Sequence, residues 1–462
     1  KLGKFIVKRS KVVLLTFIIT TIIAGAVGSL SFGRLDSGGY SDLNSDSAKA
    51  AKYVVDVFGA EEPVVVMVVD SASSTIDDPA VASTAIEIEK KIQNHTGVSK
   101  TYSYWSTGGS PTMKSKDGKA GFILVYSDID AFDWDALSAV GASLQEEFDG
   151  KYKNVQIYAS GAGVITYAIN HKIEKDLILA ESIAIPLTFL LLVFVFGALV
   201  ASATPLFVGV TAILGSFFII YILTLFTNVS VFALNLITGL GLGLGIDYAL
   251  LMVNRFREEL HNGHSVEESV VTTVATAGKT VFYSGLTVLV TMASLLFFPL
   301  EFLKSFGYAG VAVITFAVIG AVIALPALLA VLGEKVDKGV VRKSAITPKE
   351  DGRWAHTARN VMQRPVPVVI ACLVVLGIMA APVTNISFAQ VDSRVLPASN
   401  PAAIASQIVD TRFDGLIGSP IEVVVPNGVG REGEVTSFLD KVKNVEGIVR
   451  VGAIETYKQD IR

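Results

Sequence analysis

One acidic side chain is notable for its position in the sequence. Asp247 is the only carboxylate well inside any long apolar stretch of this 462-residue chain, and it precedes Asn254, where polar residues resume, by seven positions. At about 1.5 Å of rise per helical residue, its carboxyl would lie about 10 Å from that end of the stretch. A charged carboxylate in hydrocarbon costs about 3 kcal/mol or more, so burial favours its protonated form. Such a carboxyl can carry a proton if water reaches it from each side in turn; alternatively, it only hydrogen-bonds a neighbouring helix.

Three hydroxyl-bearing residues could extend a proton path from Asp247. Tyr248 follows it directly, but adjacent helical residues point about 100° apart. Tyr248 would therefore meet an acid on another helix more easily than Asp247 itself, unless it simply packs. Tyr283 and Ser284, in the next apolar stretch, are weaker candidates because hydroxyl side chains also join membrane helices without carrying protons.

Four glycines precede Asp247 at alternate positions. Gly239, Gly241, Gly243 and Gly245 form two overlapping GxxxG pairs, 239/243 and 241/245. Small residues at this spacing let membrane helices approach closely, so we expect them to pack helices. The stretch is not a phosphate-binding loop, because no Lys-Ser/Thr follows it and its context is apolar.

The composition indicates a membrane protein. Hydrophobic residues make up 51% of the chain and charged residues only 17%, against about 25% in soluble domains. The net charge of −4 shows no nucleic-acid footprint, and one cysteine cannot form an intrachain disulfide. The five histidines lack metal-ligand spacing, and no nucleophile–base constellation stands out. We therefore expect no metal, no cofactor and no enzymatic activity.

Seven apolar stretches are near the roughly 20 residues that a membrane-spanning helix needs. They cover residues 12–32, 178–199, 205–227, 231–253, 281–300, 306–332 and 366–386. The first could be a cleaved signal peptide, but its length and the six stretches after it favour a span. The sequence thus predicts an α-helical multi-span membrane protein.

Basic residues predict the orientation. Lys and Arg gather before the first span, after the fourth and after the sixth, which places residues 1–11, the loop at 254–278 and the linker at 333–365 in the cytoplasm. The loop reads as one amphipathic helix along the membrane face. Residues 34–177, where acidic residues outnumber basic ones by 21 to 13, and residues 387–462 then lie outside.

The first outside segment, residues 34–177, has the pattern of a folded domain. We expect strands at residues 63–70, 98–104, 120–127 and 154–160, and helices at 78–94 and 133–148. This β-α-β-β-α-β order is the split βαβ unit of ferredoxin-like α+β domains.

An internal repeat begins at the seventh span. Residues 31–37 (SFGRLDS) resemble residues 387–393 (SFAQVDS), and further matches align residues 55–58 with 409–413 and 63–66 with 421–425. Four shared positions in seven, at matching topology, favour a duplication over chance. A unit of six spans and one outside domain would start again here, and the chain would contain only the beginning of its second copy. Parallel repeats of this kind occur in transporters.

Three strings resemble one known family. Residues 241–260 (GLGLGIDYALLMVNRFREEL), 277–285 (AGKTVFYSG) and 296–309 (LFFPLEFLKSFGYA) are similar to the MmpL branch of the resistance-nodulation-division (RND) superfamily, and within it to the trehalose monomycolate exporters. The resemblance covers the whole chain. It implies twelve spans, two periplasmic porter domains, and proton-driven export of a mycolate glycolipid from the inner (plasma) membrane toward the envelope.

The resemblance also implies roles for individual residues. Asp247 and Tyr248 would form the proton relay with a matching Asp-Tyr pair in the tenth span. The segment from Asp36 to Tyr40 resembles the family's polar entry segment, so Ser37 and Tyr40 are weak candidates for substrate contact. The implied partners are the lipid, protons and accessory envelope proteins, in a monomer or a trimer.

Other functions remain open at this stage. The chain could export another lipid, a siderophore or a drug, although drug pumps of the superfamily usually carry larger porter domains than residues 34–177. It could also be a non-transporting scaffold of the sterol-sensing kind, in which Asp247 is only structural. Collapse of the proton gradient would stop an exporter and leave a scaffold unaffected.

Overall fold

The computed structural model describes the chain from Lys1 to Arg462 apart from short gaps. The gaps are residues 37, 40–41, 43, 60–61, 72–73, 131–132, 342–352, 387–391, 414–420, 447, 449–450 and 453. The chain forms two compact units. The bundle unit comprises Lys1–Leu35, Asp176–Phe298 and Leu303–Val391, and the sheet unit comprises Asp36–Lys175, Pro299–Phe302 and Asp392–Arg462.

Among the described residues, seven helical stretches are long and apolar enough to cross a membrane, as the sequence predicts. They are Ser10–Arg34, Ala162–Phe196, Leu199–Leu223, Ala233–His261, Val266–Phe297, Glu301–Asp337 and Pro365–Asn385. The main helices in them are α2 (Ser10–Gly28), α6 (Ala162–Phe196), α7 (Leu199–Leu223), α8 (Ala233–His261), α10 (Ala277–Ala293), α11 (Glu301–Ile319), α12 (Leu325–Leu332) and α14 (Pro365–Ala380). A helix forms hydrogen bonds between its own backbone N–H and C=O groups, which is required in hydrocarbon because hydrocarbon cannot bond them.

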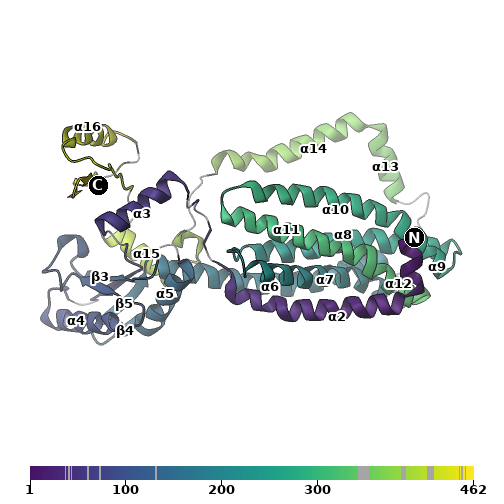
Figure 1. Cartoon of the computed structure of the whole chain (residues 1–462), viewed down its shortest axis with the longest axis horizontal. Coiled ribbons are helices and arrows are strands. Elements are labelled where there is room, and N and C mark those ends of the chain that lie inside the picture. The colour runs from purple at the N-terminus through teal and green to yellow at the C-terminus, as the bar shows by residue number, and fades with distance from the viewer. Residues whose placement is uncertain are drawn as a thin grey trace. The chain divides into compact units, whose positions relative to one another are not determined.

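The core of the bundle lies around α8. This helix packs along α7, and the two run side by side in Figure 1. Their buried side chains join others from α10 and α11 in one apolar cluster. From α8 it includes Tyr248, Ala249, Met252, Val253 and Phe256, and from the other three helices Val208, Ala212, Val281, Val313 and Ala317. This packing fixes the rotation of α8 and so decides which of its residues face inward.

The sheet unit contains the predicted ferredoxin-like fold. Its strands are β1 (Val65–Asp70), β2 (Lys100–Ser103), β3 (Ala120–Tyr126), β4 (Gly150–Tyr152) and β5 (Val155–Ser160), in the antiparallel order β2-β3-β1-β5-β4. The helices are α4 (Pro79–Gln93) and α5 (Trp134–Phe148). Without the short edge strand β4, which the sequence pattern does not predict, this is the split βαβ order. The α+β class is confirmed.

Both faces of this sheet are covered, and one of the covering helices comes from far along the chain. Side chains of α4 and α5 pack against one face. Helix α15 (Pro401–Arg412), which follows the seventh span, packs against the other, where Val409 and Phe413 join Val66, Val68 and Phe122. The rings of Phe413 and Phe122 stack with centroids 3.7 Å apart.

A helix from the first segment likewise packs against a strand pair from the second. Helix α3 (Asp46–Phe58), from the first outside segment, contacts the strand pair β6 (Thr456–Tyr457) and β7 (Asp460–Ile461). The Tyr53 hydroxyl donates to Asp460 at 2.8 Å, and the rings of Phe58 and Tyr457 lie 6.2 Å apart. The two segments thus exchange helices, which the predicted boundaries at 34–177 and 387–462 do not include.

The stretch 254–278 is not the single amphipathic helix that the sequence suggests. Its first part continues α8 to His261, a turn follows in which Gly263 has a φ of +90°, and α9 covers Val266–Ala275. Ser265 begins α9 with a capping box, in which its side chain and that of Glu268 bond each other's backbone N–H groups. Gly263 allows α8 to end, and the cap at Ser265 starts α9, so the amphipathic pattern of residues 254–278 does not form one helix.

Candidate functional site

The two candidate relay residues on α8 point in different directions. Tyr248 is 1% exposed and lies in the bundle core, whereas Asp247 is exposed on the described surface. Asp247 belongs to an exposed row that repeats every four residues along one side of α8. The row consists of Asn235, Gly239, Gly243, Asp247 and Leu251. Residues four apart share a helix face, so this row is one continuous stripe of polar and small residues with a single leucine at its end.

The alternate glycines divide between this stripe and the core. A Cβ on Gly245 would lie 2.6 Å from the Cα of Gly209 in α7, and a Cβ on Gly241 would lie 2.6 Å from Ile213. A Cβ on Gly239 or Gly243 would have no described atom within 4 Å. Within the described chain, Gly245 therefore brings the backbones of α8 and α7 together, and Gly241 makes room for the side chain of Ile213 on α7.

Tyr248 points toward α10. Its hydroxyl oxygen would be 3.6 Å from a Cβ on Gly285. The hydroxyl makes no hydrogen bond of good geometry with any described residue, although Ser284 is close to it. Tyr283 and Ser284 themselves are exposed on α10. The structure thus brings Tyr248 to the predicted support residue Ser284, and it does not bring Tyr248 to Asp247.

A charged cluster at the end of α8 was not predicted. Arg257 is only 5% exposed; its Nε donates to Asp337 at 2.7 Å and its Nη1 to the carbonyl of Phe196 at 3.0 Å. The other Asp337 oxygen lies 3.1 Å from Nε2 of His261. The Arg257 cluster therefore ties α8 to the end of α6 and to the short helix Gly333–Asp337 after α12.

The amphipathic helix predicted at residues 254–278 would present these charges to water. This was wrong for Arg257 and also for Glu259, which is 5% exposed and pairs with Arg255 and His264. Asp337 lies 80 positions from Arg257, so no local spacing could reveal the pair. The sequence offers one hint, an arginine near the end of an otherwise apolar helix.

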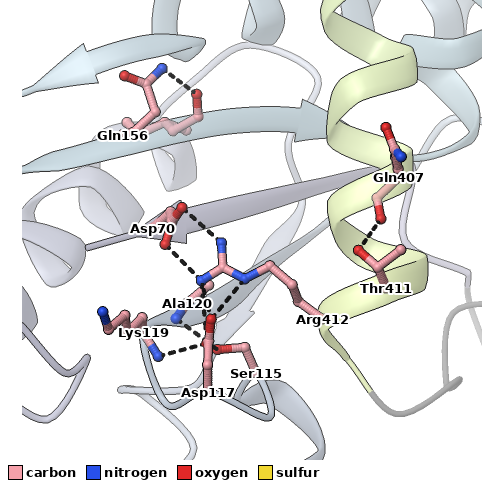
Figure 2. A network of polar contacts seen from close by, with 10 residues as sticks. Asp70, Ser115, Asp117, Lys119, Ala120, Gln156, Gln407, Thr411 and Arg412 are labelled. Atoms are coloured by element: carbon pink, nitrogen blue, oxygen red, sulfur yellow. Dashed lines mark hydrogen bonds and ion pairs between the residues drawn. The ribbon is translucent and has the colours of Figure 1, made fainter. Parts of the chain in front are cut away.

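A second cluster holds α15 to the sheet. Figure 2 shows Arg412 between two carboxylates, Asp70 at the end of β1 and Asp117 in the loop before β3. Its Nη1 and Nη2 donate to Asp70 at 2.8 and 3.0 Å, and its Nη2 lies 2.9 Å from Asp117. Burial works against the ionised form of Asp117, but hydrogen bonds from Ser115 and Lys119 and the nearby Arg412 leave its pKa below the ordinary value.

The predicted entry segment is described only in part, and Ser37 and Tyr40 lie outside the described residues. Its neighbour Asp36 accepts a hydrogen bond from the backbone N–H of Gly38 at 2.8 Å. Burial raises the pKa of Asp36, and the nearby acids Asp135 and Glu301 add to the rise. Within the described ranges, no three His, Cys, Asp or Glu side chains gather as metal ligands would.

Comparison with known proteins gives the chain its class. The model of the MMPL family matches residues 40–368, which is more than half of the chain. The chain belongs to the MMPL family. It is an RND-type membrane protein, with seven candidate spans and a ferredoxin-like sheet among the described residues.

Three relatives illustrate the similarity. A putative membrane protein of Streptomyces coelicolor is 32% identical over 96% of this chain and 61% of its own length. The trehalose monomycolate exporter MmpL3 of Mycobacterium tuberculosis is 28% identical over 91% of this chain and 48% of its own length. The mycolic acid-containing lipids exporter MmpL11 of Mycolicibacterium smegmatis is 29% identical over 62% and 30%. The chain spans about half the length of the curated relatives it matches across most of its sequence.

Proposed function

We propose that this chain belongs to a proton-driven exporter that moves a mycolate glycolipid, trehalose monomycolate, out of the inner membrane. Family membership and the printed names of the relatives support lipid export. The observation that carries the proton coupling is the stripe on α8, because it displays one ionisable group, Asp247, among small and polar residues inside a membrane span. Ionisable residues at such positions are functional far more often than structural.

The mechanism starts from the direction in which Asp247 points. Because it leaves the described bundle on the glycine side of α8, a helix of a second repeat could approach it closely over Gly239 and Gly243. Protonation would remove the charge from that contact and change the preferred spacing of the two helices. Each repeat would connect directly to one outside domain, so a change in spacing would move these domains and the lipid between them.

The orientation of the chain in the membrane is also part of the proposed function. The N-terminus and the Arg257 cluster would face the cytoplasm, and the sheet unit would face the periplasm, as the distribution of Lys and Arg favours. The entry segment at Asp36–Tyr40 would then lie at the outer end of the first span, where a lipid leaving the outer leaflet would meet it.

The test uses two variants of Asp247. Asp247→Asn keeps the shape and removes the proton site, whereas Asp247→Glu keeps a titratable group. In the full-length protein in cells or proteoliposomes, we expect the Asn variant to lose export of labelled trehalose monomycolate at unchanged thermal stability, and the Glu variant to retain part of it. Normal export by the Asn variant would refute proton coupling at this residue.

A different mycolate lipid is the second candidate, because one relative bears the name of an exporter of mycolic acid-containing lipids. Competition separates the two. Unlabelled trehalose monomycolate should reduce export of the labelled compound, and a trehalose-free mycolate lipid should not. Export of a labelled trehalose-free mycolate lipid, without export of labelled trehalose monomycolate, would assign the second lipid.

A further inference from the structure

The linker predicted at residues 333–365 contains a helix that the sequence pattern did not predict. Helix α13 covers Arg353–Gln363 and ends directly before α14, the seventh span, which starts at Pro365. Arg364, between the two, has φ −133° and ψ 57°, which is not helical. The chain therefore turns there, and Figure 1 shows α13 leaving the line of α14 instead of extending it.

Helix α13 has two chemically distinct faces. At about 100° per residue, Ala358, Val361 and Met362 fall on one side, and His356 and Asn360 fall on the opposite side. Val361 is 41% exposed and Met362 is 79% exposed, so the described residues leave the apolar face largely uncovered. An apolar helix face of this kind needs an apolar neighbour.

The charge of the segment limits what that neighbour can be. The polar side of α13 carries Arg359, and Arg364 follows its last residue. The sequence from Gly352 to Val391 contains no Asp or Glu. Arginines beside an apolar stripe fit a surface that combines anionic groups with hydrocarbon. Anionic phospholipids at a membrane surface offer both, with phosphates above and acyl chains below.

The covalent connection places α13 at such a surface. The apolar helix Pro365–Asn385 has 21 residues, close to the number that crosses hydrocarbon of about 30 Å. Its first residue must lie near one interface, and Arg364 precedes it directly. The last turn of α13 is thus held at headgroup level whatever the rest of the helix does.

From these observations we infer that α13 lies in the plane of the membrane interface and binds anionic phospholipids. Ala358, Val361 and Met362 enter the acyl region, and Arg359 and Arg364 contact the phosphates, with their stems along the apolar surface. The contact between α13 and lipid does not depend on the proposed orientation of the chain. Only the assignment of α13 to the cytoplasmic leaflet rests on it.

Spin labels on opposite faces test the inference. In a Cys372→Ser background, which removes the lone cysteine, single cysteines replace Ala358 or Asn360 in the 462-residue chain. These positions are two residues apart and point about 200° apart. In vesicles that contain phosphatidylglycerol, the label at 358 should be several-fold more accessible to oxygen than to a water-soluble nickel reagent, and the label at 360 should show the reverse.

A second arm tests the charge. A basic residue near an anionic surface contributes about 1 kcal/mol. Arg359→Gln should therefore weaken the association of α13 with phosphatidylglycerol membranes about fivefold, read as a fall in the oxygen-to-nickel accessibility ratio of the label at 358. In phosphatidylcholine vesicles the substitution should leave this ratio unchanged. Equal accessibility at 358 and 360 would overturn the inference. So would a label at 358 shielded from both reagents, because that result would mean that α13 packs against protein.

Discussion

Tyr248 and Asp247 are adjacent in the sequence, but Tyr248 is buried and Asp247 is exposed. The Tyr248 hydroxyl is buried and makes no hydrogen bond of good geometry with a described residue, which costs free energy that a stable core would avoid. Asp247 instead lies on the described surface of α8, inside a candidate span. Ser284 is the described polar side chain near the Tyr248 hydroxyl, so a small rotation of either residue would bring the two into a hydrogen bond.

The first prediction concerns Tyr248. Tyr248→Phe removes the unpartnered hydroxyl and keeps the ring, so we expect the free energy of unfolding to stay equal or to rise by up to about 1 kcal/mol. Export should fall if the hydroxyl belongs to the relay. Thermal unfolding in detergent and lipid export in proteoliposomes measure the two effects. A clear loss of stability would show that the hydroxyl is satisfied in the folded protein.

A second residue-scale prediction concerns pH. Glu87 bonds Lys153 and accepts from the Tyr152 hydroxyl at 2.8 Å, and these bonds lower its pKa from 4.5 to about 2. Because folding lowers the pKa, the carboxylate stabilises the sheet unit above pH 4.5, and this contribution disappears as the pH falls toward 2. Glu87→Gln should flatten the pH dependence of unfolding across that range. An unchanged slope would contradict the assignment.

At the scale of elements, the packing of α8 depends on one face of its glycine row. The Gly241 and Gly245 side allows α7 to approach, and the Gly239 and Gly243 side has no described neighbour. Two of the four alternate glycines therefore pack against α7, and the other two form an open face of α8. The helical period of 3.6 residues turns an alternate spacing into two faces.

This division gives a matched pair of variants. Gly245→Ala places a methyl group against the backbone of Gly209, so the 462-residue chain should lose about 1–3 kcal/mol of stability. Gly243→Ala meets open space and should change stability by less, or raise it slightly, because alanine favours helix. Chemical denaturation in one detergent compares the two. Equal losses would show that both faces pack in the same way.

Much of the fold follows from local patterns, and the contacts between distant segments do not. Apolar runs predict all seven spans, and alternation predicts four of the five strands in the sheet, because each signal lies within about 20 residues. The pairs Arg257–Asp337 and Arg412–Asp70 join residues 80 and 342 positions apart. The sequence identifies Asp247 as the candidate relay acid, but only the packing of α8 shows which way it points.

At the scale of the whole molecule, the exchange of α3 and α15 joins mechanically the two segments that are predicted to lie outside the membrane. Arg412 is the polar anchor of α15, since it bonds two carboxylates on the sheet while Phe413 stacks on Phe122. A helix anchored in this way should move with the sheet and not with the span that precedes it.

The corresponding prediction is that Arg412→Gln loosens α15. Asp70 is only 17% exposed and would lose its cation, so we expect a loss of about 2 kcal/mol and faster amide exchange across residues 401–412. Thr411→Ala is the control, because the Thr411 hydroxyl bonds only the preceding turn at Gln407. Equal exchange in both variants would mean that apolar packing alone holds the helix.

The exchanged helices also constrain how the protein is made. The face of the sheet formed by Val66, Val68 and Phe122 is complete only once residue 413 has been synthesised. At roughly 5–20 residues per second, the 342 positions between Asp70 and Arg412 take roughly 20–70 s to translate. During that time the strand layer keeps an apolar face uncovered. We therefore expect a chaperone that holds unfinished chains to bind this face until α15 is made.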